Sequence, residues 1–165
     1  MTPLVRKGLI VAALHVVIVA SVGVKLLVDR ATQPRVWART APYDPDLPIR
    51  GRYVRLRLEA LPGAGFDAPL AYDRNVTLSA HNGQLVATPS DSGANLARIS
   101  SRDDERIALL AIPVAYFIPE HIPDPSVREA GEELWVEVTV PREGPPRPIR
   151  LGVRRNGALT PLPID

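Results

Sequence analysis

An apolar run over residues 8–28, GLIVAALHVVIVASVGVKLLV, constrains this 165-residue chain more than any other feature. As an α-helix its 21 residues extend about 31 Å, which matches a bilayer hydrocarbon core of about 30 Å. No residue from 9 to 24 is formally charged, and Lys25 has a stem long enough to reach the lipid headgroups. The run therefore predicts one transmembrane helix over residues 8–28.

Two other interpretations of this run stay open. A cleaved signal peptide has a shorter apolar region, and only Val19-Ala20-Ser21 resembles a small-residue cleavage site. A buried helix of a soluble protein has a polar face, whereas only His15 and Ser21 offer polar groups between residues 9 and 24. We favour the anchor, because the run is long and apolar all round.

The orientation of the anchor follows from the layout of the chain. Counting the Lys and Arg residues on either side of the run does not favour a cytoplasmic N-terminus. A short basic segment, an apolar run and a long polar domain together resemble a signal anchor. We therefore expect residues 1–7 to be a cytoplasmic tail and the C-terminal domain to be exported.

The excess of basic residues belongs to the anchor rather than to the exported part. Residues 1–30 carry a net charge of +3, whereas residues 31–165 hold 16 Arg against 17 Asp and Glu, a net charge of −1. A nucleic-acid-binding domain needs a basic surface, so we expect no nucleic-acid partner. The exported part has one local arginine stripe, formed by Arg50, Arg52, Arg55 and Arg57.

The exported part has the pattern of a mainly β domain. Residues 29–48 contain three prolines and no periodicity, and they predict a linker before a domain over residues 49–165. Alternating apolar and polar residues predict half-buried strands over residues 52–60 and 134–140. The dipeptides Asn82-Gly83 and Asn156-Gly157 each predict a tight β-hairpin.

Two further segments complete the expected fold. Residues 106–118, RIALLAIPVAYFI, are apolar on both faces and predict a buried strand that is broken at Pro113. Residues 123–131 predict a short helix with Asp124 or Ser126 as its cap. About 120 residues of this kind suffice for a small β-sandwich or half-open barrel with a short helix.

The chain is poor in the residues that catalytic and metal sites need. It has no Cys, and no Lys follows Lys25, which excludes a Cys nucleophile and a Ser–Lys dyad inside the domain. The exported histidines, His81 and His121, have no paired spacing for zinc. We therefore expect no cofactor, no metal and no catalytic residue.

Neighbouring carboxylates leave one enzymatic alternative open. A hydrolase acting on cell-wall or other glycans needs two carboxylates across a sugar cleft. Asp103-Asp104 is more typical of a charged turn between strands, and Glu132-Glu133 of a solvated edge before a strand.

Three segments resemble the GDYXXLXY family of bacterial membrane-anchored proteins of unknown function: YDP at residues 43–45, RGRYVRLRL at 50–58 and YFIPE at 116–120. Gly51, Tyr53 and Leu56 match the motif Gly-Asp-Tyr-x-x-Leu-x-Tyr, whereas Arg52 and Leu58 replace its Asp and its second Tyr. The resemblance implies a single span in the bacterial inner membrane and a periplasmic domain. Because a gene for a multi-pass membrane protein often neighbours such genes, it also implies such a protein as a partner.

The motif residues are the candidate contact surface: Arg50, Gly51, Tyr53, Leu56, Tyr116, Phe117, Pro119 and Glu120. In a purely structural interpretation, Phe117 fills the core, Pro119 ends a strand and Glu120 pairs with an arginine of a neighbouring strand. In a functional interpretation, Tyr116 and Glu120 border a contact surface near the arginine stripe. Trp37, just past the membrane, is expected in an interfacial aromatic belt.

Together these patterns favour a non-enzymatic, membrane-tethered β domain that binds a membrane or envelope partner protein. The alternatives are a carboxylate-dependent hydrolase and a binder of small ligands or glycans that uses the arginine stripe.

Overall fold

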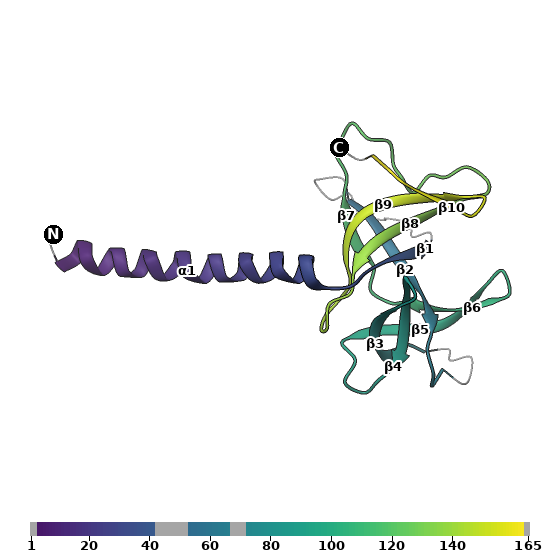
Figure 1. The fold of residues 1–165 in the computed structure, drawn as a ribbon, viewed down its shortest axis with the longest axis horizontal. Helices are drawn as coiled ribbons and strands as arrows, with labels where there is room; N and C mark the ends of the chain where they lie inside the picture. The colour runs from purple at the N-terminus through teal and green to yellow at the C-terminus, as the bar shows by residue number, and fades with distance from the viewer. Residues whose placement is uncertain (1–2, 42–52, 67–71, 164–165) are drawn as a thin grey trace. The chain divides into compact units, whose positions relative to one another are not determined.

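The computed structural model describes residues 3–41, 53–66 and 72–163. The chain divides into two compact units, Met1–Gln33 and Pro34–Asp165. The first holds the helix α1 (Pro3–Thr32), and the described residues of the second form ten strands (Figure 1). The strands are β1 (Arg35–Ala41), β2 (Tyr53–Pro62), β3 (Arg74–His81), β4 (Gln84–Pro89), β5 (Asn95–Arg102), β6 (Glu105–Leu110), β7 (Val114–Phe117), β8 (Glu132–Thr139), β9 (Arg147–Arg155) and β10 (Ala158–Pro161).

The helix α1 contains the apolar run and extends beyond it at both ends. Its segment Val5–Val28 has a mean hydropathy of 2.4, and none of it is buried in the protein. The polar side chains of the run bond to the helix backbone: Ser21 donates to the Ile18 carbonyl over 2.7 Å, and His15 Nδ1 lies 2.8 Å from the Val11 carbonyl. The helix is therefore long and apolar enough to cross a membrane, with its inner polar groups satisfied locally.

The β unit contains a closed six-stranded barrel with additional strands. The barrel order is β1-β4-β3-β5-β6-β2, and β2 pairs back to β1 to close it. Strands β8, β9 and β10 continue the sheet from the other edge of β1, and β7 pairs with the first half of β2. The expected mainly β fold after one apolar helix is confirmed.

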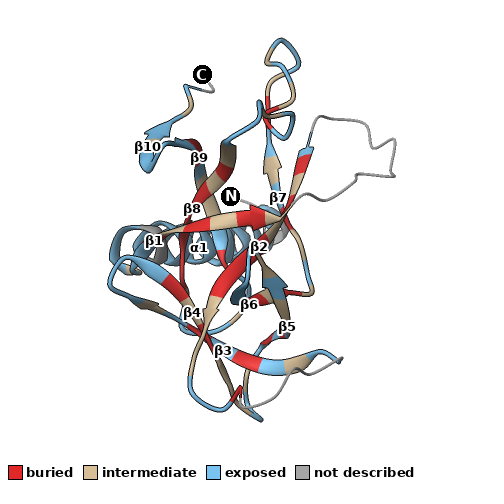
Figure 2. Ribbon diagram, turned by 90° about the vertical axis from the view of Figure 1, so that its right-hand side faces the viewer, coloured by how far each residue is buried: buried red, intermediate tan, exposed pale blue. Residues whose placement is uncertain are grey.

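Alternation along the strands produces the core. In β2 the side chains of Val54, Leu56, Leu58 and Ala60 are buried, and the intervening positions up to Arg57 are more exposed (Figure 2). Leu58, which stands where the family motif has Tyr, is completely buried. Because side chains alternate between the two faces of a strand, this pattern fills the barrel from one face of β2.

Tight turns connect the hairpins as the sequence predicted. Asn82 and Gly83 between β3 and β4 have φ values of 49° and 76°, and Asn156 and Gly157 between β9 and β10 have 51° and 82°. Two consecutive residues with positive φ form the turn that suits the twist of a two-residue hairpin. Asp103 and Asp104 form the same kind of turn between β5 and β6, as expected for this charged pair.

The predicted break at Pro113 is also confirmed. The apolar segment divides into β6 and β7, and both pair with β2 at different levels. Ala108 of β6 lies opposite Ala60, whereas Val114 of β7 lies opposite Leu56. One apolar stretch therefore covers two successive parts of the same strand.

Two expectations were wrong. The predicted linker at residues 29–48 instead contains the end of α1 and all of β1, with only Gln33 and Pro34 between them. The inward-facing side chains of β1 are Val36, Ala38 and Thr40, and this set has too little apolar character to stand out as a strand.

The predicted short helix at residues 123–131 is absent from that segment, which the structure describes throughout. Asp124 Oδ1 instead accepts hydrogen bonds from the backbone N–H and the hydroxyl of Ser126, over 2.8 and 2.7 Å. Val127 is 74% exposed, so no apolar helix face is buried here to stabilise a single turn.

The barrel core predicts a large stability difference between two identical substitutions. Leu58→Ala removes a completely buried side chain and is expected to lower the free energy of unfolding by about 2–5 kcal/mol. Leu96→Ala, at a position that is 36% exposed, serves as the matched control and is expected to cost about 1 kcal/mol or less. Urea unfolding of the detergent-solubilised chain measures both, and equal losses would contradict the assignment of Leu58 to the core.

Candidate functional site

A pocket of about 470 Å³ opens between β1, β2, β4, β6 and β8. Its walls include Trp37 and Trp135, and its charged lining residues are Arg39, Glu59, Glu105, Glu133 and Arg154. Gly131 and the Asn156-Gly157 turn also line it. We call this the tryptophan pocket.

Arginines are stacked on both tryptophans. The guanidinium carbon of Arg150 lies 5.4 Å from the ring centroid of Trp37, and that of Arg154 lies 5.0 Å from the ring centroid of Trp135. The indole N–H of Trp135 donates to Glu133 over 3.1 Å. Cation–π contacts and this hydrogen bond hold both rings in fixed orientations.

Gly152 allows Trp37 to approach β9 closely. A Cβ atom at Gly152 would lie 2.9 Å from the indole ring of Trp37 and 3.1 Å from the carbonyl oxygen of Thr160. A side chain at this position would therefore displace the indole or the neighbouring strand, so glycine is required for the observed packing.

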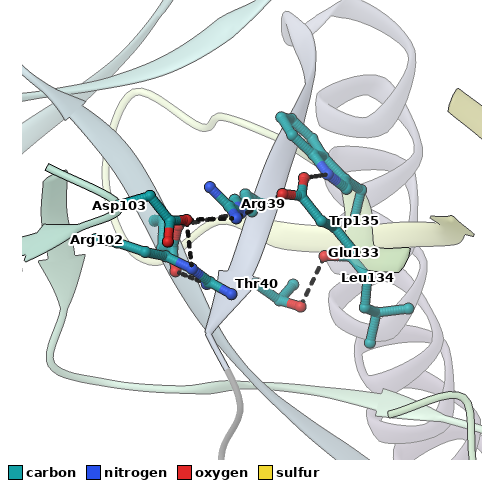
Figure 3. Close-up of polar contacts among 8 residues, drawn as sticks. Arg39, Thr40, Arg102, Asp103, Glu133, Leu134 and Trp135 are labelled. Atoms are coloured by element: carbon teal, nitrogen blue, oxygen red, sulfur yellow. Dashed lines mark hydrogen bonds and ion pairs between the residues drawn. The ribbon is translucent and has the colours of Figure 1, made fainter. Parts of the chain in front are cut away.

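An ion-pair network crosses one wall of the pocket (Figure 3). Arg39 on β1 and Glu59 on β2 are direct cross-strand partners, and Arg39 Nε lies 3.8 Å from Glu59 Oε2. Arg39 Nη2 also contacts Glu133 Oε1 at 2.5 Å. Arg102 Nη1 contacts Glu59 Oε1 at 2.5 Å, and both arginines lie within 4 Å of Asp103. The network joins β1, β2, β5 and β8.

The pairing of these carboxylates favours binding over acid–base chemistry. The Glu59 side chain is only 5% exposed and lies between Arg39 and Arg102, and Glu133 is held by Arg39 and by Trp135. A general acid or base must exchange its proton with a substrate. Glu133 contacts Arg39 and accepts from the Trp135 indole, and Glu59 Oε1 accepts from Arg102, whereas the buried Glu59 Oε2 has no hydrogen-bond partner and has Arg39 Nε 3.8 Å away. The wall therefore presents fixed charges beside flat aromatic rings.

Glu132, at the start of β8, is surrounded by donors of its own. The backbone N–H of Glu129 donates to Glu132 Oε2 over 3.3 Å, Arg155 Nη2 lies 2.7 Å from Glu132 Oε1, and Arg128 lies 3.7 Å from Oε2. The hydrogen bond from Glu129 and the nearby guanidinium charges lower the pKa of Glu132 below its ordinary value of 4.5.

The motif residues lie elsewhere in the domain. Tyr53 and Phe117 are cross-strand partners of β2 and β7, and their rings meet edge to face with centroids 5.5 Å apart. Phe117 is 58% exposed, so the interpretation that it fills the core was wrong. Its place in the core is taken by the next residue, Ile118, which is 2% exposed.

The remaining motif residues divide by burial. Leu56 is buried, Tyr116 packs half-buried against the core, Pro119 follows the end of β7 and Glu120 is exposed. Arg50 and Gly51 lie outside the described residues, and the described motif residues do not line the tryptophan pocket.

Trp37 and Arg39 were missed because their segment was predicted to be a linker. Trp37 lies in β1 and packs against Gly152 of β9, and its expected place in an interfacial belt stays a prediction. One signal was present in the sequence: Gly152 interrupts the alternation of a late strand, which indicates the close approach of a bulky group.

The described residues include no group of three His, Asp or Glu side chains arranged to hold a metal ion. Comparisons with protein-family models, with curated proteins and with solved structures found no match to this chain. The resemblance to the GDYXXLXY family therefore stays a prediction.

The ion-pair network predicts a large cost for removing its central cation. Arg39→Gln leaves Glu59 with one arginine and Glu133 with none from this network, and it is expected to lower the free energy of unfolding by about 2–4 kcal/mol. Arg98→Gln makes the same chemical change at an exposed position of β5 and is expected to change it by less than about 0.5 kcal/mol. Urea unfolding at neutral pH compares the two, and a similar small effect of both would show that the network contributes little.

The lowered pKa of Glu132 predicts acid-dependent stability. A folded-state pKa below the unfolded value stabilises the fold above about pH 4.5, and this contribution is lost as the pH falls through the folded pKa. Glu132→Gln should therefore be less stable than the wild type at neutral pH, and the difference should shrink as the pH falls below 4.5. Unfolding curves at a series of pH values test this. Arg155→Gln should cause part of the same loss of stability at neutral pH. If the stability difference between Glu132→Gln and the wild type does not change with pH, the lowered pKa of Glu132 is refuted.

Proposed function

We propose that this protein is a membrane-anchored, non-enzymatic binding domain of the bacterial envelope. In this proposal α1 holds the chain in the inner membrane and the β domain lies in the periplasm. The tryptophan pocket there receives a segment of a membrane or envelope partner protein, for which a multi-pass membrane protein is the candidate that the family resemblance suggests.

The unburied apolar helix is the observation that carries the proposal. The segment Val5–Val28 has a mean hydropathy of 2.4, and none of it is buried within the protein. Exposing 24 such residues to water is unfavourable, at about 25 cal/mol for each Å² of apolar surface. A bilayer removes this cost, and it ties the β domain to the membrane surface.

The chemistry of the pocket supports binding of a protein segment. Tryptophan and arginine are the residue types that most often dominate the energy of protein interfaces, and here they are paired in fixed positions. The lining also presents the exposed carboxylate of Glu105. A partner segment with an apolar or cationic side chain matches this combination of flat rings and carboxylates.

A second candidate is a binder of glycans or small ligands. It is favoured by the same two tryptophans, because flat aromatic rings next to polar groups are also typical of small-molecule sites. This alternative uses the tryptophan pocket instead of the arginine stripe.

Photocrosslinking in intact cells tests the proposal. A photoreactive amino acid at Gln84, an exposed lining residue of the pocket, is expected to form an adduct with one envelope protein. Adding Trp135→Ala should reduce the adduct at least about tenfold, since truncating a hot-spot tryptophan costs about 2 kcal/mol or more. The exposed position Thr77 on β3, which does not line the pocket, is the matched control site and should give no such adduct.

The same cells report the location of the domain. Because the chain has no Cys, Ser92→Cys supplies a unique thiol that a membrane-impermeant maleimide should label in spheroplasts without lysis. Labelling only after lysis would refute the periplasmic location. Adduct formation at Gln84 that is insensitive to Trp135→Ala would refute the pocket as the binding site. Quenching of tryptophan fluorescence by wall-glycan fragments, without any protein adduct, would favour the glycan binder.

A further inference from the structure

We infer that the occupant of the tryptophan pocket is a cationic side chain, a lysine or an arginine, on the partner segment. This inference rests on the proposed function and narrows it, because that function admits either an apolar or a cationic side chain. Three features of the β unit support a cation: an acidic rim, an unfilled acceptor in the wall, and arginines already stacked on both tryptophans.

The walls of the pocket are balanced in charge except for one carboxylate. Among its lining residues, Arg39 and Arg154 balance Glu59 and Glu133, and Glu105 is the remaining charge. The lining therefore has a net charge of −1, and the excess lies at Glu105, the exposed first residue of β6.

The turn before Glu105 extends this negative charge along the rim. Residues 102–105 hold three carboxylates against Arg102, a local net charge of −2. Asp103 lies 3.5 Å from the pocket-lining Arg39 and 3.9 Å from Arg102, so it is partly neutralised. The side chains of Asp104 and Glu105 are exposed and have no hydrogen-bond or ion-pair partner within the described part of the chain. A cation at this rim meets carboxylates that no neighbouring residue neutralises.

The sequence of this turn places charge where other residues would fit the backbone better. Asp103 and Asp104 have φ values of 51° and 65°, and the two other hairpin turns of this kind have Asn-Gly at these positions. Glycine adopts a positive φ without the steric cost that a side chain brings. Two successive aspartates therefore add negative charge to the rim at the expense of backbone strain.

Glu59 contributes an unfilled acceptor to the wall. Its side chain is 5% exposed, and its Oε1 accepts from Arg102 over 2.5 Å. Its Oε2 accepts no hydrogen bond, because Arg39 Nε lies 3.8 Å away and is itself without a hydrogen-bond partner. The N–H donors of a lysine or arginine match such an acceptor, whereas an apolar side chain has none to offer.

The arginines of the protein itself show that these rings hold cations. Arg154, an exposed residue that lines the pocket, has its guanidinium carbon 5.0 Å from the ring centroid of Trp135, within the distance of a cation–π contact. Within the described residues Arg154 forms no ion pair, whereas Arg150 on Trp37 is also held by Glu137 at 2.6 Å. Arg154 is therefore the more easily displaced, and it occupies the ring that a cation of the partner would take.

Tryptophan fluorescence tests the inference on the full chain in a non-ionic detergent. The chain has two tryptophans and both line the pocket, so their emission reports on this pocket alone. The probes are acetylated, amidated pentapeptides Gly-Ser-x-Ser-Gly in which x is arginine, lysine, norleucine or glutamate. The arginine and lysine peptides should change the emission saturably, and the norleucine and glutamate peptides should not.

Single substitutions show whether charge causes this selectivity. Glu105→Gln should weaken binding of the arginine peptide about twofold to fivefold, the range that an exposed charge pair contributes. Arg154→Gln should strengthen it by a similar factor, because it removes a like charge and the side chain that covers Trp135. Glu143→Gln, at an exposed carboxylate that does not line the pocket, is the matched control and should change nothing. Equal binding of the norleucine and arginine peptides, tighter binding of the glutamate peptide, or an affinity that neither lining substitution alters would overturn the inference.

The adduct at Gln84 in intact cells separates this inference from the proposed function. Glu105→Arg reverses the charge at the rim and should reduce the adduct at least about twofold, whereas Glu143→Arg should leave it unchanged. An adduct that is lost with Trp135→Ala but insensitive to Glu105→Arg would overturn the cationic side chain and leave the partner protein. The absence of any adduct at Gln84 would overturn the proposed function, and this inference with it.

Discussion

The pairing of β1 with β2 is the constraint on which the β domain depends. One edge of β1 pairs with β8, and the other edge pairs with β2 and with the start of β4. Strand β1 therefore belongs both to the closed barrel and to the additional sheet of β8, β9 and β10. Strands β2 and β4 also pair directly, but only through Leu61 with Val86 and Pro62 with Ala87. Without β1 they would be joined only there, and β8, β9 and β10 would lose their pairing with the barrel.

The charged pair at this junction also specifies how the strands align. Arg39 and Glu59 are direct partners, and both side chains project away from the apolar face that Ala38 and Leu58 share. A slip of one residue would turn Arg39 toward that apolar face, where its charge would have no partner. A buried ion pair contributes little to the free energy of folding, because removing both charges from water costs about as much as their attraction gains. A buried charge without a partner, in contrast, is strongly destabilising. We infer that this pair selects one register of β1 against its neighbours.

The elements that could be predicted from the sequence are those whose signal is local. The apolar helix, the Asn-Gly hairpins and the alternation of β2 each depend on residues within a few positions of one another. Strand β1 was missed because its partners lie far away in the sequence, and a strand with Val36, Ala38 and Thr40 inside has almost no local signature. Phe117 was misplaced by one position, because the alternation restarts after Pro113 and directs Ile118, rather than Phe117, into the core.

The tryptophan pocket could not be predicted for the same reason. It brings together Trp37 of β1, Glu59 of β2 and Trp135 of β8, and only the strand pairing makes them neighbours. No spacing rule connects residues that are 76 positions apart, as Glu59 and Trp135 are. The resemblance to a family directed attention to Tyr53 and Phe117 on β2 and β7, which form an exposed aromatic pair outside this pocket.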